Sequence, residues 1–150
     1  LTGRILDAGV GTGRNIPFYP PDSDMVGIDL SPAMLTRATR RRGEAGRDVA
    51  LIEMDVMNTS FEDDSFDFII SITTLHNLYN YELKQAVQEI QRVGKGANKH
   101  IIIESYRNER EKANLLYWQL TCRSFYTPQE WEWFFEQSGY TGDYAYVFYE

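Results

Sequence analysis

A glycine-rich turn directly after an apolar run near the start of the chain limits most strongly how this sequence can fold. Residues 4–13 read Arg-Ile-Leu-Asp-Ala-Gly-Val-Gly-Thr-Gly, so a buried strand runs into Gly9, Gly11 and Gly13. A turn that bends tightly and brings its backbone N–H groups close to a ligand has no room for Cβ atoms. The next apolar run reaches Asp29, where a carboxylate can accept hydrogen bonds from ribose hydroxyls. The pattern therefore predicts a cofactor that carries a nucleoside.

Length and charge exclude several classes of protein. The chain has 150 residues, 43% of them hydrophobic, which is enough for one core and therefore for one domain. A formal net charge of −7 disfavours nucleic acid and anionic lipid as partners. Cys122 is the only cysteine, and no apolar run approaches the ~20 residues that span a bilayer. We expect a cytoplasmic protein that binds neither nucleic acid nor membrane.

Strand-like apolar runs alternate with segments of helical periodicity along the chain. Strands are predicted at residues 4–10, 25–30, 49–56, 66–72, 100–104 and 144–149. Helices are predicted at residues 14–19, from Pro32 onward behind a Ser31 cap, at 81–93, at 108–120, and from the Thr127 capping box to Gly139. This alternation predicts an α/β fold, a doubly wound three-layer αβα sandwich around a Rossmann-like, mostly parallel sheet.

Glycine spacing separates two classes of cofactor. Dinucleotide enzymes prefer G-x-G-x-x-G, whose third glycine would fall at position 14, and that residue is Arg14. Here the glycines alternate instead and follow Asp7 directly. A nicotinamide-dependent oxidoreductase is therefore the weaker alternative.

Four motifs in register resemble the class I S-adenosylmethionine-dependent methyltransferases, in the small-molecule branch typified by ubiquinone and menaquinone methyltransferases. The resemblance extends from Ile5 to about Ile103. It rests on residues 6–13, on residues 26–31, on Glu53-Met54-Asp55-Val56, and on residues 61–71 with the following Leu75-His76-Asn77-Leu78. It implies S-adenosyl-L-methionine as the cofactor, S-adenosyl-L-homocysteine as the product and a small-molecule acceptor.

The resemblance also implies roles for individual residues. Backbone groups of Gly9, Gly11 and Gly13 would approach the methionine and ribose parts, and Asp7 would hold the amino group directly or through water. Asp29 would bind the ribose hydroxyls. The remaining cofactor contacts implied are Leu30 on the adenine face, Asp55 and the Val56 N–H on the adenine edge, and Ser71 near the methionine amino group.

The chemistry implied needs little more than alignment, because a sulfonium methyl group is already activated. No metal is expected, since the sequence has no histidine pair at ligand spacing and no Cys-x-x-Cys. The candidate base or substrate contact is His76, expected at the mouth of the cleft. The alternative is a structural histidine.

Acceptor recognition is expected from residues 105–127, where the resemblance becomes thin. Glu104, Tyr106 and Arg107 follow the fifth predicted strand and are candidate acceptor contacts, with an ion pair at the sheet edge as the alternative. Tyr117 and Trp118 are candidates for an aromatic wall, with core packing as the alternative.

Two departures from the family pattern leave a second function open. The helices that usually precede the first motif are absent, so the fold is expected to be truncated at its N-terminus. Only residues 144–149 remain for the final antiparallel hairpin. An open cleft and an uncovered sheet edge favour a homodimer. They are also compatible with a second function, that of a module which binds the cofactor without catalysis and serves as a partner or regulator.

Overall fold

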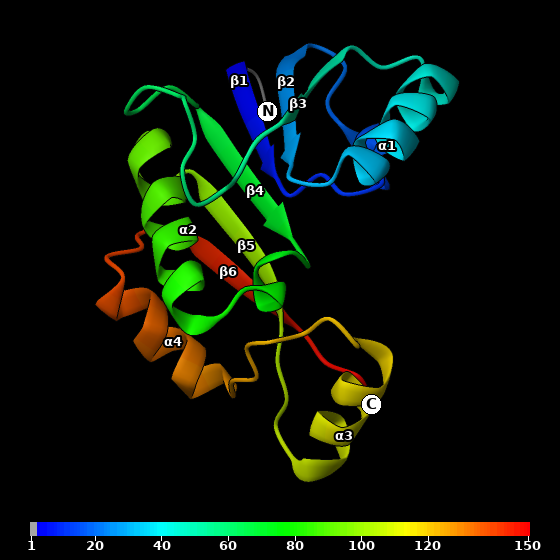
Figure 1. Cartoon of the computed structure of the whole chain (residues 1–150). Helices are drawn as coiled ribbons and strands as arrows, with labels where there is room; N and C mark the ends of the chain where they lie inside the picture. The colour runs from blue at the N-terminus through cyan, green and yellow to red at the C-terminus, as the bar shows by residue number, and fades with distance from the viewer. Residues whose placement is uncertain (1–2) are drawn as a thin grey trace.

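Six strands form one sheet in the computed structural model, which describes residues 3–150 (Figure 1). The strands are β1 (Gly3–Ala8), β2 (Ser23–Asp29), β3 (Val49–Glu53), β4 (Phe68–Ile72), β5 (Lys99–Glu104) and β6 (Asp143–Val147). Their order is β3-β2-β1-β4-β5-β6, and every neighbouring pair is parallel. The chain moves outward from β1 to β3 and returns on the other side of β1 with β4. In such sheets ligands bind where the order reverses, outside the carboxyl ends of the strands.

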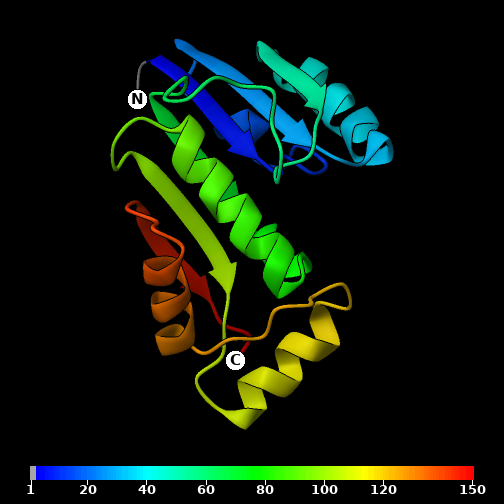
Figure 2. The same cartoon turned by 60° about the vertical axis from the view of Figure 1, so that its left-hand side comes forward.

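Helices cover both faces of the sheet (Figure 2). On one face lie α1 (Pro32–Ala45) and the short 3-10 helix η1 (Ile16–Phe18), which pack with Ile5, Met25 and Val49. On the other face lie α2 (Asn80–Val93) and α4 (Pro128–Gln137). Their side chains form the larger core with apolar residues of the strands. The 3-10 helix η2 (Leu75–Asn77) follows β4, and α3 (Glu109–Trp118) lies beyond the carboxyl ends of the strands.

Local signals in the sequence explain where the helices begin and end. Ser31 caps α1 by accepting a hydrogen bond from the Met34 N–H at 3.4 Å, and Pro32 occupies the first turn. Gly46 ends α1 in the left-handed conformation, with φ of 60°. Thr127 and Glu130 form the predicted capping box at the start of α4.

The predicted three-layer αβα sandwich is confirmed, with differences in detail. The helix predicted at residues 14–19 shortens to η1, because Pro17 and Pro20 interrupt the run of backbone N–H donors. The strand predicted at 49–56 ends at Glu53. The last strand, β6, pairs in parallel with β5, and residues 3–150 contain no antiparallel strand pair. No helix within these residues is long and apolar enough to cross a bilayer.

Candidate cofactor and active site

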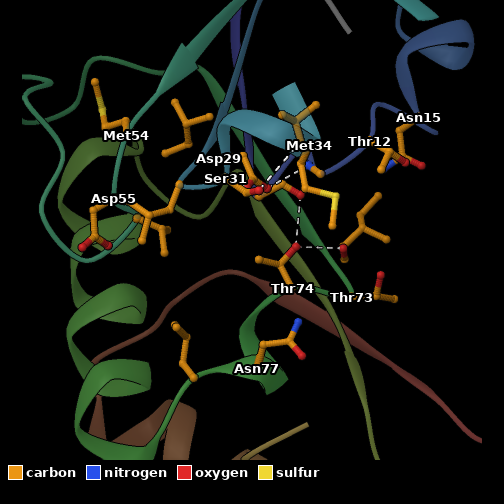
Figure 3. Close-up of a pocket in the computed structure, with 18 of the residues that line it drawn as sticks. Thr12, Asn15, Asp29, Ser31, Met34, Met54, Asp55, Thr73, Thr74 and Asn77 are labelled. Atoms are coloured by element: carbon orange, nitrogen blue, oxygen red, sulfur yellow. Dashed lines mark hydrogen bonds between the residues drawn. The ribbon is translucent and has the colours of Figure 1, made fainter. Parts of the chain in front are cut away.

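A cleft of about 630 Å³ opens at the carboxyl ends of β1, β2, β3 and β4, at the point where the strand order reverses (Figure 3). Its walls come from the loop after β1, the junction of β2 with α1, the loop after β3, and the end of β4 with η2. Its charged side chains are Arg14, Asp29 and Asp55. Gly9, Gly11, Asp29 and Asp55, which the sequence singled out as cofactor contacts, line this cleft.

Backbone geometry explains two of the glycines in the loop after β1. Gly9 has φ of 98°, and a Cβ atom there would lie 2.3 Å from Cγ2 of Thr74. Gly13 has φ of 76°, and its Cβ would lie 2.9 Å from the Cα of Ala38 in α1. The N–H of Gly9 donates to the carbonyl of Ile28 at 3.0 Å, which ties the loop to the end of β2. The loop thus approaches both β4 and α1 more closely than any side chain would permit.

Asp29 joins the glycine loop to the start of α1. Its Oδ2 accepts a hydrogen bond from the Gly11 N–H at 3.0 Å, and its Oδ1 accepts one from the Ser31 N–H at 2.9 Å. A carboxylate has about four lone-pair positions, so both oxygens keep capacity for ligand hydroxyls. Leu30 and Met34 line the same wall and are 62% and 41% exposed, which offers an apolar surface beside the carboxylate.

Asp55 lies across the cleft from Asp29, in the loop after β3 (Figure 3). Its Oδ1 accepts a hydrogen bond from the Met57 N–H at 2.8 Å, and Val56 between them lines the cleft. The loop is anchored to α2, where Glu89 accepts hydrogen bonds from both the N–H and the hydroxyl of Thr59 at 2.8 and 2.7 Å. Hydrogen bonding to Arg92 lowers the pKa of Glu89, which keeps this anchor charged.

Three residues expected in the cofactor site, Asp7, Gly13 and Ser71, lie outside the cleft lining, and Asp7 and Ser71 are buried beneath the glycine loop. The Asp7 carboxyl is buried and accepts a hydrogen bond from the Tyr19 hydroxyl. Burial raises the pKa of Asp7 to about 6, against the smaller opposing effect of the Tyr19 hydrogen bond. The Ser71 hydroxyl donates to the carbonyl of Ala8 at 2.8 Å. Both side chains support the loop from below.

The end of β4 carries a backbone conformation that sequence reasoning missed. Thr73 has φ of 51°, which is rare for a β-branched residue, and it lines the cleft. Its N–H donates to the carbonyl of Ile102 at 2.9 Å, and the Thr74 hydroxyl donates to the carbonyl of Gly9 at 3.1 Å. These contacts hold the strained turn against β5 and the glycine loop.

Comparison with known proteins finds methyltransferases among the relatives of this chain. The family model described as "Methyltransferase domain" matches residues 5–96. A phosphatidylethanolamine N-methyltransferase of Cereibacter sphaeroides is 30% identical over 110 residues, which are 72% of this chain and 53% of that protein. A demethylmenaquinone methyltransferase of Thermus thermophilus is 31% identical over 104 residues, 67% of this chain and 46% of that protein. The chain spans about half the length of these curated relatives.

The chain belongs to the class I S-adenosylmethionine-dependent methyltransferases. Solved structures show the same fold. The YcgJ protein from Bacillus subtilis superposes with a TM-score of 0.74, at 23% identity, over 90% of this chain and 60% of that one.

The cleft fits the cofactor that defines these methyltransferases. The Gly11–Asp29 hydrogen bond fixes a carboxylate beside the backbone, Leu30 and Met34 give an apolar surface, and Asp55 stands opposite. An adenosine has the same alternation of polar edges and apolar faces. Within the described part of the chain, no group of three His, Cys, Asp or Glu side chains is placed to hold a metal ion.

The structure places the candidate acceptor contacts elsewhere than expected. His76 is 1% exposed and does not line the cleft, so the structure corrects its expected place at the cleft mouth. The physical reason is its pairing with the buried Glu104, with 2.5 Å between Nδ1 and Oε2. Glu104 is therefore turned toward η2 and also lies outside the cleft lining.

The other candidate acceptor contacts also lie outside the cleft lining. Arg107 forms ion pairs with Glu111 of α3 and with Glu150, and it lies over the Phe148 ring. Lys112 lies over the Tyr106 ring. Tyr117 and Trp118 contact each other edge to face and are 73% and 67% exposed.

Four neutral residues that were not candidate acceptor contacts line the cleft: Thr73, Asn77, Leu78 and Gln119. Only the motif around Leu75–Leu78 hinted at them, because Gln119 reaches the cleft through tertiary folding alone.

Proposed function

We propose that the chain binds S-adenosyl-L-methionine in this cleft and directs its methyl group to a small-molecule acceptor by in-line displacement. The observation that carries the proposal is the convergence of the Gly11–Asp29 pair and Asp55 on one cleft at the strand reversal. When bound, the cofactor supplies an electrophilic methyl group on a positively charged sulfur. The lone pair of the acceptor forms the new bond to carbon, and the electrons of the broken C–S bond remain on sulfur.

The residues of the chain bind and orient. Asp29 binds the ribose hydroxyls, and Leu30 lies on the adenine face. Asp55 and the Val56 N–H read the adenine edge, since an acceptor and a donor side by side distinguish adenine from other bases. The backbone of Gly9, Gly11 and Gly13 follows the ribose and methionine parts. Asp7 and Ser71 act from beneath the loop on the side of the methionine amino group.

The expected domain assignment is also part of the proposal. Residues 1–150 form one S-adenosylmethionine-binding domain, in which 105–127 is the acceptor-side segment. The segment is bound to η2, because the Thr121 hydroxyl donates to Oδ1 of Asn77 at 2.7 Å and the Arg123 N–H donates to the carbonyl of His76 at 2.8 Å. The printed names of the relatives, which specify phosphatidylethanolamine and demethylmenaquinone, support a small molecule as acceptor. The homodimer and the cytoplasmic location stay predictions.

The second candidate is a module that binds the cofactor without catalysis. It is favoured by the neutral acceptor side of the cleft, where Thr73, Asn77 and Gln119 offer no charged group to assist the reaction. Methyl transfer by proximity and orientation needs none, so we place it second.

Calorimetry and turnover separate the candidates. Titration with S-adenosyl-L-homocysteine tests binding, and transfer of a labelled methyl group to a mixture of phenolic, amine, thiol and enol acceptors tests chemistry. Binding with turnover supports the enzyme, and binding without turnover across the mixture supports the second candidate. An absence of binding contradicts both.

A further inference from the structure

The chain buries an ionisable pair directly behind the acceptor side of the cleft. Nδ1 of His76, in η2, lies 2.5 Å from Oε2 of Glu104, the last residue of β5. The two side chains are 2% and 0% exposed. Buried ionisable groups are costly to keep, so a pair whose histidine directly precedes Asn77 of the cleft lining calls for a function.

A proton must lie between these two atoms. An unprotonated Nδ1 and a carboxylate oxygen are both acceptors and would repel each other at this distance. A buried pair with net charge would be costly, whereas one added proton makes the pair neutral as a whole. Imidazolium beside carboxylate and imidazole beside carboxylic acid then differ only in the position of that proton. All four polar atoms of the pair, Nδ1 and Nε2 of His76 and Oε1 and Oε2 of Glu104, are sealed from solvent and have no hydrogen bond of ordinary geometry among residues 3–150. The close approach of Nδ1 and Oε2 is therefore the contact on which both residues depend.

Neighbouring charged groups point elsewhere. Arg107 binds Glu111 and Glu150, and Arg123 lies over the ring of Tyr79. From α2, Glu82 accepts a hydrogen bond from the Tyr79 N–H at 2.8 Å. Cys122 is close enough to feel the charge of Glu104, but burial is the main cause that raises its thiol pKa to about 11, so it is neutral at physiological pH. Their arrangement leaves Glu104 and His76 to neutralise each other.

The pair is attached to residues that shape the cleft. The residues after His76, Asn77 and Leu78, line the acceptor side, and Figure 3 shows Asn77 reaching in below Thr74. The carbonyl of His76 accepts hydrogen bonds from the N–H groups of Arg123 and Ser124 at 2.8 and 3.1 Å. His76 thus joins η2 to the end of β5 through its side chain and to the segment before α4 through its backbone.

We propose that His76 and Glu104 are positioning residues, which share one proton between Nδ1 and Oε2 and thereby fix η2 as the acceptor-side wall of the cleft. The acceptor role of this wall rests on the proposed function, whereas the shared proton does not. His76 does not act as a general base, because its Nδ1 is engaged and its Nε2 has no access to the cleft. A positioning role for His76 and Glu104 therefore replaces the hypothesis that His76 is a general base, and the shared proton can be observed directly.

The chain has few histidines, so the proton on the His76 ring can be observed by NMR. His76 and His100 are the only histidines, and His100 is half-buried on β5, so it provides an internal control. Proton and nitrogen NMR spectra of the two rings are recorded at pH 7, with a His100→Gln variant to assign the signals. We expect a far-downfield Nδ1 proton for His76 and none for His100. A His76 ring without such a proton would overturn the proposal.

Variants then separate positioning from general stability. Glu104→Gln keeps the shape and an acceptor oxygen but removes the charge, so the far-downfield signal of the His76 Nδ1 proton should be lost. Amide exchange over 75–78 should accelerate about tenfold while S-adenosyl-L-homocysteine affinity changes less than about twofold, because the cofactor residues lie on other elements. Unchanged exchange in a folded variant contradicts the positioning role.

A second variant, Glu104→Asp, tests the same role if Glu104→Gln folds poorly. Glu104→Asp keeps the charge and moves it by one methylene, so the His76 ring should keep a downfield Nδ1 proton while amide exchange over 75–78 accelerates. If wild-type protein fails to bind S-adenosyl-L-homocysteine, the proposed function fails, but the Nδ1 proton signal of His76 in the ligand-free protein still decides the shared proton.

Discussion

The N–H of Gly11 donates to Oδ2 of Asp29 at 3.0 Å, so the glycine loop after β1 and the acidic end of β2 form one unit. The second oxygen of Asp29 is held by the N–H of Ser31, at the start of α1. Two of the most informative residues in the sequence are therefore in direct contact, and the carboxylate is oriented by the backbone of both elements. A ligand that binds here meets a preorganised acceptor.

Gly9→Ala tests the close approach of the loop to β4. The new Cβ would meet Cγ2 of Thr74 at 2.3 Å, and φ of 98° is unfavourable for alanine. We expect the free energy of unfolding to fall by about 2–4 kcal/mol in urea titrations. Gly43→Ala is the matched control, because Gly43 lies in α1 with no atom within 4 Å of its Cβ position. That control should stabilise the protein by about 0.5–1 kcal/mol. Equal effects of the two changes would contradict the packing described.

Asp7→Asn tests the burial of a carboxyl beneath the loop. The pKa of Asp7 is about 6 in the folded protein and 3.8 ordinarily, so between these values the folded state binds more protons than the unfolded state. The free energy of unfolding of the wild-type protein therefore falls as pH rises from about 4 to about 6, by about 3 kcal/mol in total. The Asp7→Asn variant has no carboxyl to titrate at this position. Its free energy of unfolding relative to wild type should therefore increase over that pH range and stay constant above it.

Asp67→Asn should change the pH dependence of the free energy of unfolding in the opposite direction, so it serves as the contrast to Asp7→Asn. Hydrogen bonding to Lys95 lowers the pKa of Asp67, so its contribution is present at neutral pH and disappears on acidification. Urea titrations of both variants at several pH values measure the two slopes. If Asp7→Asn shows the same pH dependence as wild type, Asp7 is not the buried group described.

Asp55→Asn tests the reading of adenine. The Asp55 carboxylate faces the cleft and is fixed through Met57. Loss of a charged acceptor toward an exocyclic amine should weaken S-adenosyl-L-homocysteine binding about tenfold in calorimetry. The inosine analogue, which has a carbonyl in place of the amine, should bind wild type poorly and the variant almost as well as the adenosine form. A variant that keeps full preference for adenosine would remove Asp55 from the recognition of the base.

The sequence alone predicts those parts of the fold and of the candidate site that local sequence patterns specify. The order of apolar runs predicts the sheet, and residues 9–13 and Asp29 mark the cleft because each of them lies at the end of an apolar strand. Caps such as Ser31 and Thr127 are equally local. Each of these features depends on residues within a few positions of one another.

The remaining parts depend on contacts between distant elements. Tyr19 reaches Asp7 only after η1 folds beneath the loop, and no local pattern marks Thr73 for positive φ. His76 looked like a group at the cleft mouth because its motif precedes Asn77, which does line the cleft. Its burial is set by Glu104 at the end of β5, a partner that becomes visible only when β4 and β5 are side by side.

The most direct test of the account is calorimetric titration of the protein with S-adenosyl-L-homocysteine, comparing wild type with Asp29→Asn and with Asp48→Asn. Asp48 is an exposed carboxylate outside the cleft lining, so it controls for loss of charge alone. We predict one binding site in wild type, unchanged affinity in Asp48→Asn, and affinity at least about tenfold weaker in Asp29→Asn. No heat and no thermal protection by the ligand in wild type, or equal affinity in all three proteins, would contradict the account.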